Sequence, residues 1–300
     1  MKNIDHLLAT AALAVLGTTG AFAQSVGSAC GCPDVSSRTP VNISTLVDGN
    51  GNLLNGATTL TCNNVYTLNS RLYVNNGQDL YIEPGTVIKA NSSPGNAYSI
   101  IVARGGQIWA NGSESCPIIM TATADPLDGS YSVLNRGMWG GLVLLGRAYN
   151  NVRNADASVA VTGTDGVALI EGLLAGDNRH FYGMPIGQEV NDDNSGILRY
   201  VSLRHGGEII GANNEINGLT MGSVGSGTTI DHVEVIANKD DGFEFFGGTV
   251  NAKYLVAMHC DDDYIDWDQA YSGKLQFVYG VQGPDNSGGA NNQGDNGFEM

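Results

Sequence analysis

Acidic side chains gather in two segments near the C-terminal end of the sequence. They are Asp240, Asp241 and Glu244 in the first segment, and Asp261, Asp262, Asp263, Asp266 and Asp268 in the second. Carboxylates in irregular turns are ligands that Ca²⁺ prefers in proteins. Two carboxyl groups held about 5 to 9.5 Å apart can also cleave a glycosidic bond. Which chemistry is open to these residues depends on how the chain brings the two segments together.

A sequence repeat predicts that the two acidic segments lie side by side. Residues 240–245 match residues 262–267 at a shift of 22, and the pattern returns at residues 295–300. Just upstream, the match is at a shift of 21 and joins Val233, Val235 and Ala237 to Tyr254, Val256 and Met258. Stacking the repeats then places Asp240 beside Asp262, Asp241 beside Asp263 and Glu244 beside Asp266.

The elements that carry these residues are predicted to be short strands. Runs of β-forming residues at 72–74, 80–82, 86–88, 100–102 and 118–120 alternate with Gly, Asn, Asp and Pro turns, and hardly any stretch has helical period. A repeat of about 20 to 50 residues is typical of a solenoid. Each unit holds at least two strands with apolar residues inward and carboxylates outward. The sequence therefore predicts an all-β fold, a right-handed parallel β-helix.

A stacked column of carboxylates requires something to neutralise it. Like charges about 5 Å apart repel by roughly 1 to 3 kcal/mol per pair, so the column needs a counter-ion or raised pKa values. Calcium is the cofactor we expect, with all eight acidic residues named above as candidate ligands. The alternative is a solvated acidic turn whose Asp side chains accept hydrogen bonds from local N–H groups. The sequence has no EF-hand or nonapeptide calcium signature, so both interpretations stay open.

A further interpretation makes the carboxylates catalytic, in a polysaccharide lyase or glycoside hydrolase. The candidates are Asp240, Asp241, Asp262, Asp263 and Glu244. The paired aspartates are similar to those of polygalacturonases, but no Asn-Thr-Asp precedes them and no Gly-His-Gly or Arg-Ile-Lys follows them. A calcium-dependent lyase also needs an Arg or Lys base, and the nearby Lys239, Lys253 and Lys274 are more typical of surface salt bridges. We therefore assign no catalytic residue.

Three aromatic residues, Phe246, Trp267 and Tyr271, lie next to the acidic residues in the sequence. If their rings point outward they can stack on a sugar, and we treat them as the candidate glycan platform, although aromatic residues more often fill the interior of a β-helix. The evenly spaced His205, His232 and His259 do not form one column, because the shift of 21 carries His232 to Lys253.

The beginning of the chain predicts export. Residues 1–23 hold Lys2, an apolar run too short to span a bilayer, and the A-x-A pattern Ala21-Phe22-Ala23, which together are typical of a signal peptide. No later segment is a transmembrane candidate, so we expect a secreted protein, extracellular or at the bacterial cell surface. The formal charge of -16, from 14 basic and 30 acidic residues, argues against nucleic acid or anionic lipid as partners.

Five cysteines in an exported chain predict at least one disulfide. Cys30 and Cys32 are too close in the sequence to pair easily with each other. We therefore expect either Cys30 or Cys32 to pair with Cys62 and to staple the N-terminal segment. Zinc is not expected, because neither paired C-x2-C elements nor histidines at ligand spacing are present.

Residues 73–89, 101–112, 198–207 and 227–248 carry a resemblance to a known family. They are similar to a large group of secreted bacterial right-handed β-helix proteins of the pectate-lyase-like superfamily, whose members mostly have no assigned function. The resemblance implies the fold. Because lyases, hydrolases, adhesins and structural rods all share that fold, the function must be argued from a site.

The expected organisation is a signal peptide at 1–23, an N-terminal segment and cap at 24–70, and a parallel β-helix at 71–300 with an irregular insertion near 150–194. The last repeat is interrupted at residue 300, so the helix is expected to continue beyond it. We expect an exported rod with a structural, adhesive or glycan-binding role, stabilised by calcium, with a glycan or cell-surface component as its partner. The alternatives are a polysaccharide-cleaving enzyme and a self-assembling filament subunit that stacks head to tail.

Overall fold

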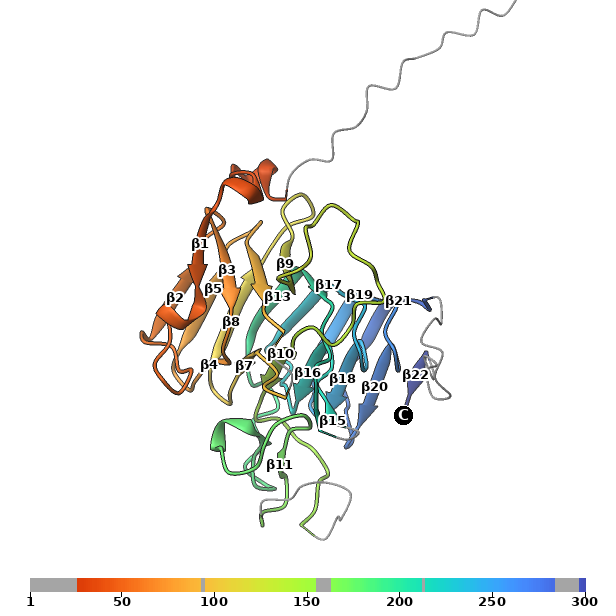
Figure 1. Cartoon of the computed structure of the whole chain (residues 1–300). Helices are drawn as coiled ribbons and strands as arrows, with labels where there is room; N and C mark the ends of the chain where they lie inside the picture. Colours follow the sequence, from red (N-terminus) through yellow and green to blue (C-terminus); the bar gives the residue numbers. More distant parts are fainter. Residues whose placement is uncertain (1–25, 93–94, 155–162, 212–213, 284–296) are drawn as a thin grey trace, which may run out of the picture.

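Short aliphatic strands, each ended by a Gly, Asn or Asp turn, stack in parallel along one axis (Figure 1). The computed structural model describes residues 26–92, 95–154, 163–211, 214–283 and 297–300, so the expected signal peptide at 1–23 lies outside the described residues. Within these ranges all the helices are short 3-10 helices, η1 (Ser28–Cys30), η2 (Val35–Ser37), η3 (Ile43–Thr45) and η4 (Asn178–His180). None of them has the length and apolar character that a membrane crossing requires.

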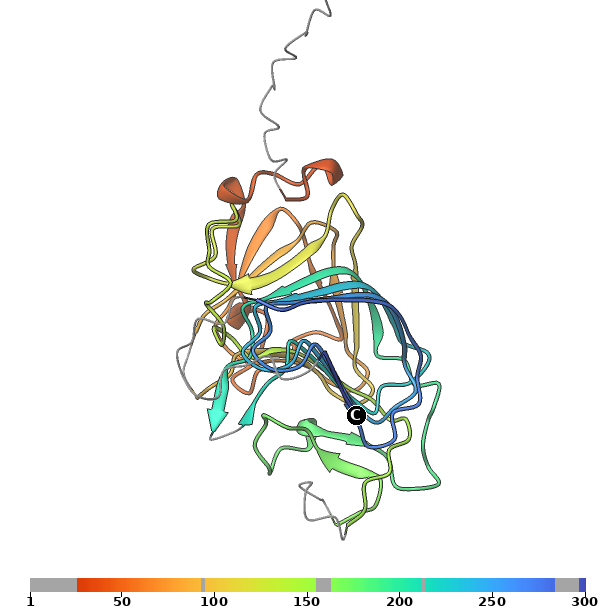
Figure 2. The same ribbon diagram turned by 90° about the vertical axis from the view of Figure 1, so that its right-hand side faces the viewer.

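The strands form two large parallel sheets that close around one interior. The seven-stranded front sheet holds β4 (Leu72–Val74), β7 (Ser99–Val102), β10 (Gly141–Leu145), β16 (Leu219–Gly222), β18 (Phe243–Phe246), β20 (Ile265–Asp268) and β22 (Phe298–Glu299). The eleven-stranded rear sheet holds β1 (Thr39–Asn42), β2 (Ala57–Leu60), β3 (Asn64–Leu68), β5 (Asp79–Ile82), β6 (Val87–Ala90), β8 (Gln107–Asn111), β9 (Ile118–Ala122), β13 (Gly196–Arg204), β17 (Thr229–Ile236), β19 (Asn251–Met258) and β21 (Leu275–Val281). Figure 2 views the coils from the side of the last strands and shows the two sheets facing each other across the interior. The fold is the all-β parallel solenoid that the sequence predicts.

The register between coils is uniform where the acidic residues lie. Strand β18 pairs with β20 with Glu244 opposite Asp266, and β17 pairs with β19 with Val233 opposite Leu255, so both pairings have a shift of 22. The shift of 21 inferred for residues 233–237 is therefore wrong by one residue. Leu255 is fully buried whereas Tyr254 is 39% exposed, and a slip of one residue would turn every side chain of the strand to the opposite face.

In the later coils the rear sheet consists of long strands that bend once. The first part of β13 pairs with β8 and its second part pairs with β9, so one strand forms two walls of the helix. The bend lies at Tyr200, and the same position in the next three coils holds His232, Tyr254 and Phe277, all with φ between 47° and 59°. We call these four residues the corner column. A left-handed φ is rare for residues with bulky side chains, so the bend is a fixed feature of each coil.

Two hydrophobic cores hold the molecule together. The main core fills the helix and takes the inward side chains of both sheets, for example Leu144, Leu198, Phe243 and Leu255. The second core lies on the outer face of the front sheet, where Tyr73, Ile101 and Val143 meet Tyr182 and other residues of the insertion. The insertion includes the antiparallel pair β11 (Val167–Leu169) and β12 (Phe181–Gly183), drawn in green below the helix in Figures 1 and 2. A smaller antiparallel pair, β14 (Ile209–Gly211) and β15 (Asn214–Glu215), follows β13.

The parallel ladder begins well before residue 71, where the sequence placed its start. Strand β1 pairs with β3 and β2 pairs with β5, so residues 39–68 already belong to the rear sheet. In β2 the side chains alternate between exposed and buried, as in a strand with one face on the core. Only the segment with η1 and η2 precedes the ladder, and residues 43–56, with η3, connect β1 to β2 outside the strands.

Two disulfides attach the N-terminal segment to the ladder. Cys32 is bonded to Cys62, and Cys30 is bonded to Cys116 across 86 residues of sequence. The sequence left open which of the two early cysteines joins Cys62, and it did not suggest Cys116. Cys260 is buried and has a free thiol.

Candidate metal centre

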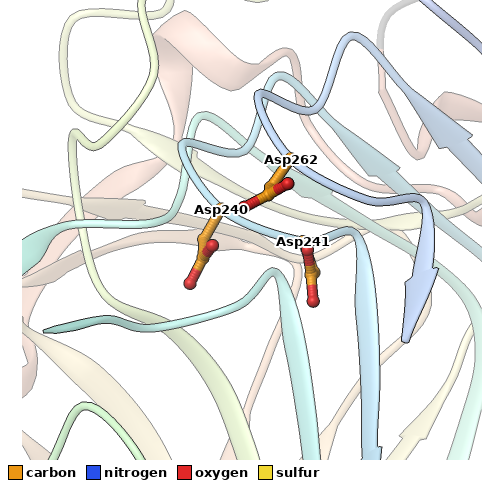
Figure 3. A group of neighbouring side chains, drawn as sticks. All are labelled: Asp240, Asp241 and Asp262. Atoms are coloured by element: carbon orange, nitrogen blue, oxygen red, sulfur yellow. The ribbon is translucent and has the colours of Figure 1, made fainter. Parts of the chain in front are cut away.

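The acidic residues come together at one edge of the front sheet. Asp240 and Asp241 end the turn before β18, and Asp262 and Asp263 end the corresponding turn before β20. Because neighbouring coils are in register, these turns lie one above the other, and Figure 3 shows Asp240, Asp241 and Asp262 close together. Further along the two strands, Glu244 and Asp266 stand side by side on the outer face of the sheet.

Two groups of three carboxylates are close enough to share a cation. Oxygens of Asp240, Asp241 and Asp262 lie within 4.8 Å of one another, and oxygens of Asp241, Glu244 and Asp266 do the same. Asp241 belongs to both groups and joins them. The donors are all carboxylate oxygens from irregular turns and strand edges, a set that suits Ca²⁺, whereas Zn²⁺ favours nitrogen and sulfur ligands.

Burial makes these groups reluctant to carry charge. Asp241 is 8% exposed, and burial followed by the charge of Asp240 raises its pKa to about 9. Glu244 is 6% exposed, and burial followed by the carboxylate of Glu171 from the insertion raises its pKa well above the ordinary value. The pKa of half-buried Asp266 is also raised, first by burial and then by Glu299. Without a cation, burial therefore favours the protonated form of both Asp241 and Glu244.

Asn217 links the two most buried carboxyl groups. Its side-chain nitrogen donates to Glu244 Oε2, and its side-chain oxygen accepts from the backbone N–H of Asp241 at 3.1 Å. Asp241 Oδ1 in turn accepts from the backbone N–H of Asp263 at 2.8 Å. Asp266 lies beside Glu244, and a side-chain hydrogen bond with Glu244 lowers the pKa of Asp266 against the raising effect of burial. The network fixes the orientation of Asp241 and Glu244.

Three of the predicted ligands, Asp261, Asp263 and Asp268, lie outside both groups in the described residues. Asp261 forms ion pairs with Arg136 and Lys239, which balance its charge and argue against a role as a metal ligand. Arg136 approaches from a loop 125 residues earlier in the sequence, a contact that no repeat could reveal. Asp263 is buried and contributes its backbone N–H to Asp241. Asp268 is exposed at the far end of β20.

The predicted aromatic platform does not form. Phe246 is only 6% exposed and packs against Tyr182 with ring centroids 6.0 Å apart, because the insertion covers this part of the front sheet. Trp267 and Tyr271 are partly buried against the main core. The Tyr271 ring lies 4.6 Å from Phe245, and its hydroxyl donates to the backbone oxygen of Val250 at 2.8 Å. Phe246 is thus buried and Trp267 and Tyr271 are partly buried, which argues against a role as a sugar platform.

The lysines weighed as catalytic bases have other contacts. Lys239 pairs with Asp261, and Lys253 lies 3.5 Å from Asp231 on the outer face of the rear sheet. Lys274 directly precedes β21, and its backbone N–H donates to the side-chain oxygen of Asn251 at 3.0 Å. Neither ion pair directs its lysine toward Asp241 or Glu244.

Asn217 and Glu171 also contribute to the site, although the sequence did not predict them. Asn217 could have been found, because residues 217–221 repeat the pattern of residues 241–245 one coil earlier, with Asn217 in the place of Asp241. The backbone N–H of Gly218 bonds Asp241 just as that of Gly242 bonds Asp263, which confirms the equivalence. Glu171 belongs to the insertion, which has no repeat, so no pattern indicated its position.

Comparison with known protein families finds a match over most of the chain. Residues 51–300 match the family described as the pectate-lyase like beta helix domain. No curated protein and no solved structure matches the chain. The match covers the coils that carry the acidic residues as well as the insertion.

Proposed function

The chain belongs to the pectate-lyase-like β-helix family, and from that premise we propose that it is an exported β-helix scaffold that binds calcium at Asp240, Asp241, Asp262, Glu244 and Asp266. Calcium neutralises the stacked carboxylates and joins the last coils. The scaffold serves binding at the outside of the cell and not cleavage of a polymer.

The position of Asp241 carries this proposal. Its carboxyl group is buried, belongs to both carboxylate groups and has a pKa near 9 because of burial and Asp240. A buried carboxyl group of this kind is stable either with a proton or with a cation. Three or more carboxylates around one point offer the oxygen ligands that Ca²⁺ needs, and flexible turns suit its irregular geometry better than that of Mg²⁺.

Export is supported by the two disulfides. Bonds Cys30–Cys116 and Cys32–Cys62 fix the N-terminal segment, and disulfides of this kind persist in oxidising compartments outside the cytoplasm. Extracellular calcium modules work with dissociation constants of about 10⁻⁴ to 10⁻³ M. An exported protein therefore meets enough calcium to fill a site of modest affinity.

Burial argues against the polysaccharide-cleaving alternative. A glycosidase needs two carboxyl groups that contact the substrate, but Asp241 and Glu244 are at most 8% exposed and Glu244 is held by Asn217. The neighbouring cations Arg136 and Lys239 are both paired with Asp261, so neither is free to act as a lyase base. We therefore propose a structural role for these carboxylates.

The proposal is tested by thermal unfolding at equal ionic strength, once with 2 mM Ca²⁺ and once with chelator. This calcium concentration is about ten times a typical dissociation constant for such modules. Calcium should raise the unfolding midpoint by several degrees, because a ligand of the folded state stabilises it by mass action. The variant Asp241→Asn should lose this rise, and Asp192→Asn, which changes an exposed carboxylate elsewhere, should keep it. Mg²⁺ at the same concentration should have a much smaller effect. An unchanged wild-type midpoint would overturn the proposal, as would an equal rise in Asp241→Asn.

A further inference from the structure

A pocket lies where the insertion meets the first coils of the helix. Its volume is about 760 Å³, within the range of small-molecule sites. The loop at residues 47–51 lines one part of it, and residues of the insertion between 174 and 180 line another. Arg71, in the turn before β4, and Tyr73, on β4, complete the lining. The pocket therefore exists only because segments far apart in the sequence meet over β4.

Both sides of the pocket are held in place by backbone contacts. The backbone N–H of Tyr73 donates to the backbone oxygen of Gly51 at 2.8 Å. Gly51 has a φ of 80°, and a Cβ there would lie 2.5 Å from the backbone oxygen of Arg71, so only glycine allows this approach. From the insertion, the Arg179 guanidinium donates to the backbone oxygen of Asn50 at 2.9 Å. The shape of the pocket is thus fixed in the folded chain.

Two arginines act on the buried ring of Tyr73. The Cζ atom of Arg179 lies 3.5 Å from the ring centroid. Burial raises the pKa of Tyr73, whereas the charge of Arg71 and a side-chain hydrogen bond with it lower that pKa. The Tyr73 hydroxyl also lies 2.8 Å from His180 Nε2, and His180 Nδ1 lies 2.8 Å from the backbone oxygen of Leu174. Because that oxygen can only accept, Nδ1 carries the hydrogen, and the neutral His180 accepts from Tyr73.

Only one of the two arginines has a carboxylate partner. Arg179 Nη2 lies 2.6 Å from Asp177 Oδ2, and the hydrogen bonds from Arg179 lower the pKa of Asp177 to about 2, so this pair stays charged. Within the described part of the chain, no carboxylate lies at ion-pair distance from Arg71. Arg71 Nε donates to the backbone oxygen of Ala97 at 3.5 Å. Most of its five N–H groups therefore stay available to a ligand.

The other carboxylate of the pocket is engaged by its own loop. Asp48 Oδ1 accepts from the backbone N–H groups of Asn50 and Asn52 at 2.8 and 2.9 Å, and Oδ2 accepts from the Asn52 side chain at 2.9 Å. These bonds, with that of the Asn52 side chain first, lower the pKa of Asp48. Arg71 is therefore the cation of the pocket whose charge the chain does not balance. An anion bound to it would also offset its repulsion from Arg179.

The surroundings of Arg71 indicate which anion fits. A guanidinium binds a carboxylate through two parallel hydrogen bonds. Apolar surface is close by, because Leu174 lines the pocket and is 63% exposed, with Val47 and Ala175 also in the lining. The formal charge of -16 repels ligands that carry many negative charges. A ligand with one carboxylate and an apolar group therefore matches the pocket better than an acidic polymer does.

From these contacts we propose that Arg71 and the surrounding pocket bind a carboxylate that is carried by an apolar group. The carboxylate accepts hydrogen bonds from the guanidinium of Arg71, and the apolar group packs on Leu174. The carboxylate belongs either to a free organic acid or to the C-terminus of a peptide, since the chemistry of recognition is the same. The inference does not depend on calcium, because β4 is the first strand of the front sheet and the acidic edge lies at β18 and β20.

Isothermal titration with N-acetyl-leucine tests the proposal, with N-acetyl-leucinamide as the neutral comparison. We expect saturable binding of the acid and none of the amide. Arg71→Met should weaken binding at least about tenfold, because it removes the charged donors. Arg71→Lys keeps the charge but loses the planar fork, so it should weaken binding several-fold. The matched control is Arg199→Met, which removes an arginine with a 43% exposed side chain on β13, outside the pocket, and should leave binding unchanged.

A pentapeptide of four alanines and a C-terminal leucine separates the two sources of the carboxylate. If it binds more tightly than N-acetyl-leucine and its C-terminal amide does not bind, the ligand is a chain terminus. If it binds more weakly, the ligand is a free acid. Either result supports recognition of the carboxylate.

Four results would overturn the proposal: no binding of N-acetyl-leucine, equal binding of its amide, equal binding by Arg71→Met, or tighter binding of inorganic phosphate or hexagalacturonate than of N-acetyl-leucine. Repeating the titration in chelator, below the unfolding midpoint, separates this proposal from the calcium site. Saturable binding there supports the pocket even if calcium proves to have no effect on the midpoint.

Discussion

The acidic edge of the front sheet and the corner column of the rear sheet are built by the same stacking, with opposite energetic results. On the front sheet, the shift of 22 places Glu244 beside Asp266; on the rear sheet, the same shift places His232 beside Tyr254. Aligned carboxylates repel one another and need a proton or a cation. Aligned rings attract one another and need nothing further. In a solenoid, the chemistry of one column thus decides whether stacking stabilises the coil or makes it depend on a ligand.

The largest expected effect concerns pH, which should act most strongly on the acidic edge. The pKa of Asp241 is about 9 in the folded chain and about 4 in an unfolded chain, so the folded chain binds more protons between these values. In chelator, the contribution of Asp241 is therefore complete below about pH 4 and is lost as the pH rises toward 9, a change on the order of several kcal/mol. Unfolding midpoints at pH 5, 7 and 9 should fall steadily in chelator.

With calcium, the unfolding midpoint should fall much less between pH 5 and pH 9, because the cation binds the ionised carboxylates and competes with the protons. Asp241→Asn removes the titrating group, so its midpoint in chelator should fall less between pH 5 and 9 than that of the wild type. If the wild-type midpoint in chelator rises from pH 5 to pH 9, burial does not raise the pKa of Asp241 as stated.

The next effect compares a glutamate on each sheet. Glu244→Gln keeps the shape of the side chain and its bond to Asn217 but removes a ligand, so calcium affinity should fall about tenfold, or about 1.4 kcal/mol. Because burial raises the pKa of Glu244 and favours its neutral form, a neutral amide should be tolerated here, and stability in chelator at pH 7 should change by less than about 1 kcal/mol. Calcium titration followed by unfolding midpoint measures both quantities. Glu234→Gln, on β17 of the rear sheet, is the control and should leave calcium affinity unchanged.

The corner column should show a smaller effect, independent of calcium. Tyr254 has a ring neighbour on each side, His232 and Phe277. Tyr254→Asn removes both contacts while placing at the bend a residue that tolerates the left-handed φ. We expect a loss of about 1 kcal/mol, equal in calcium and in chelator, from chemical denaturation. A loss that appears only in chelator would mean that the corner column and the acidic edge are coupled, so that the two columns do not act independently.

The smallest expected effect is on Asp261, the acidic residue that the tertiary structure separates from the site. Its two ion pairs, with Arg136 and Lys239, occupy its carboxylate. Asp261→Asn should therefore change the calcium dissociation constant by less than about twofold, although it weakens the attachment of the Arg136 loop. A tenfold loss of calcium affinity, equal to that expected for Glu244→Gln, would mean that Asp261 is a calcium ligand.

The repeats predicted most of the contacts between neighbouring coils. The shift of 22 at residues 240–245 gave the neighbours of Glu244 and Asp240, and with them the candidate ligands. The shift of 21 at Val233 failed because Tyr254 and Leu255 are both apolar, so the pattern of the strand fits either residue inward. Only the packed interior distinguishes them, with Leu255 buried and Tyr254 39% exposed. The same error hid the corner column, since it matched His232 with Lys253.

The sequence by itself determined the parallel coils, the family and the alignment of carboxylates on neighbouring strands, because these follow from a local period that stacking repeats. The tertiary structure decided which acids form a site and which rings are exposed. The insertion covers Phe246 and brings Glu171 toward Glu244. Arg136 forms an ion pair with Asp261, and Cys30 forms a disulfide with Cys116. These contacts join segments with no common period, so only the folded chain brings them within reach of one another.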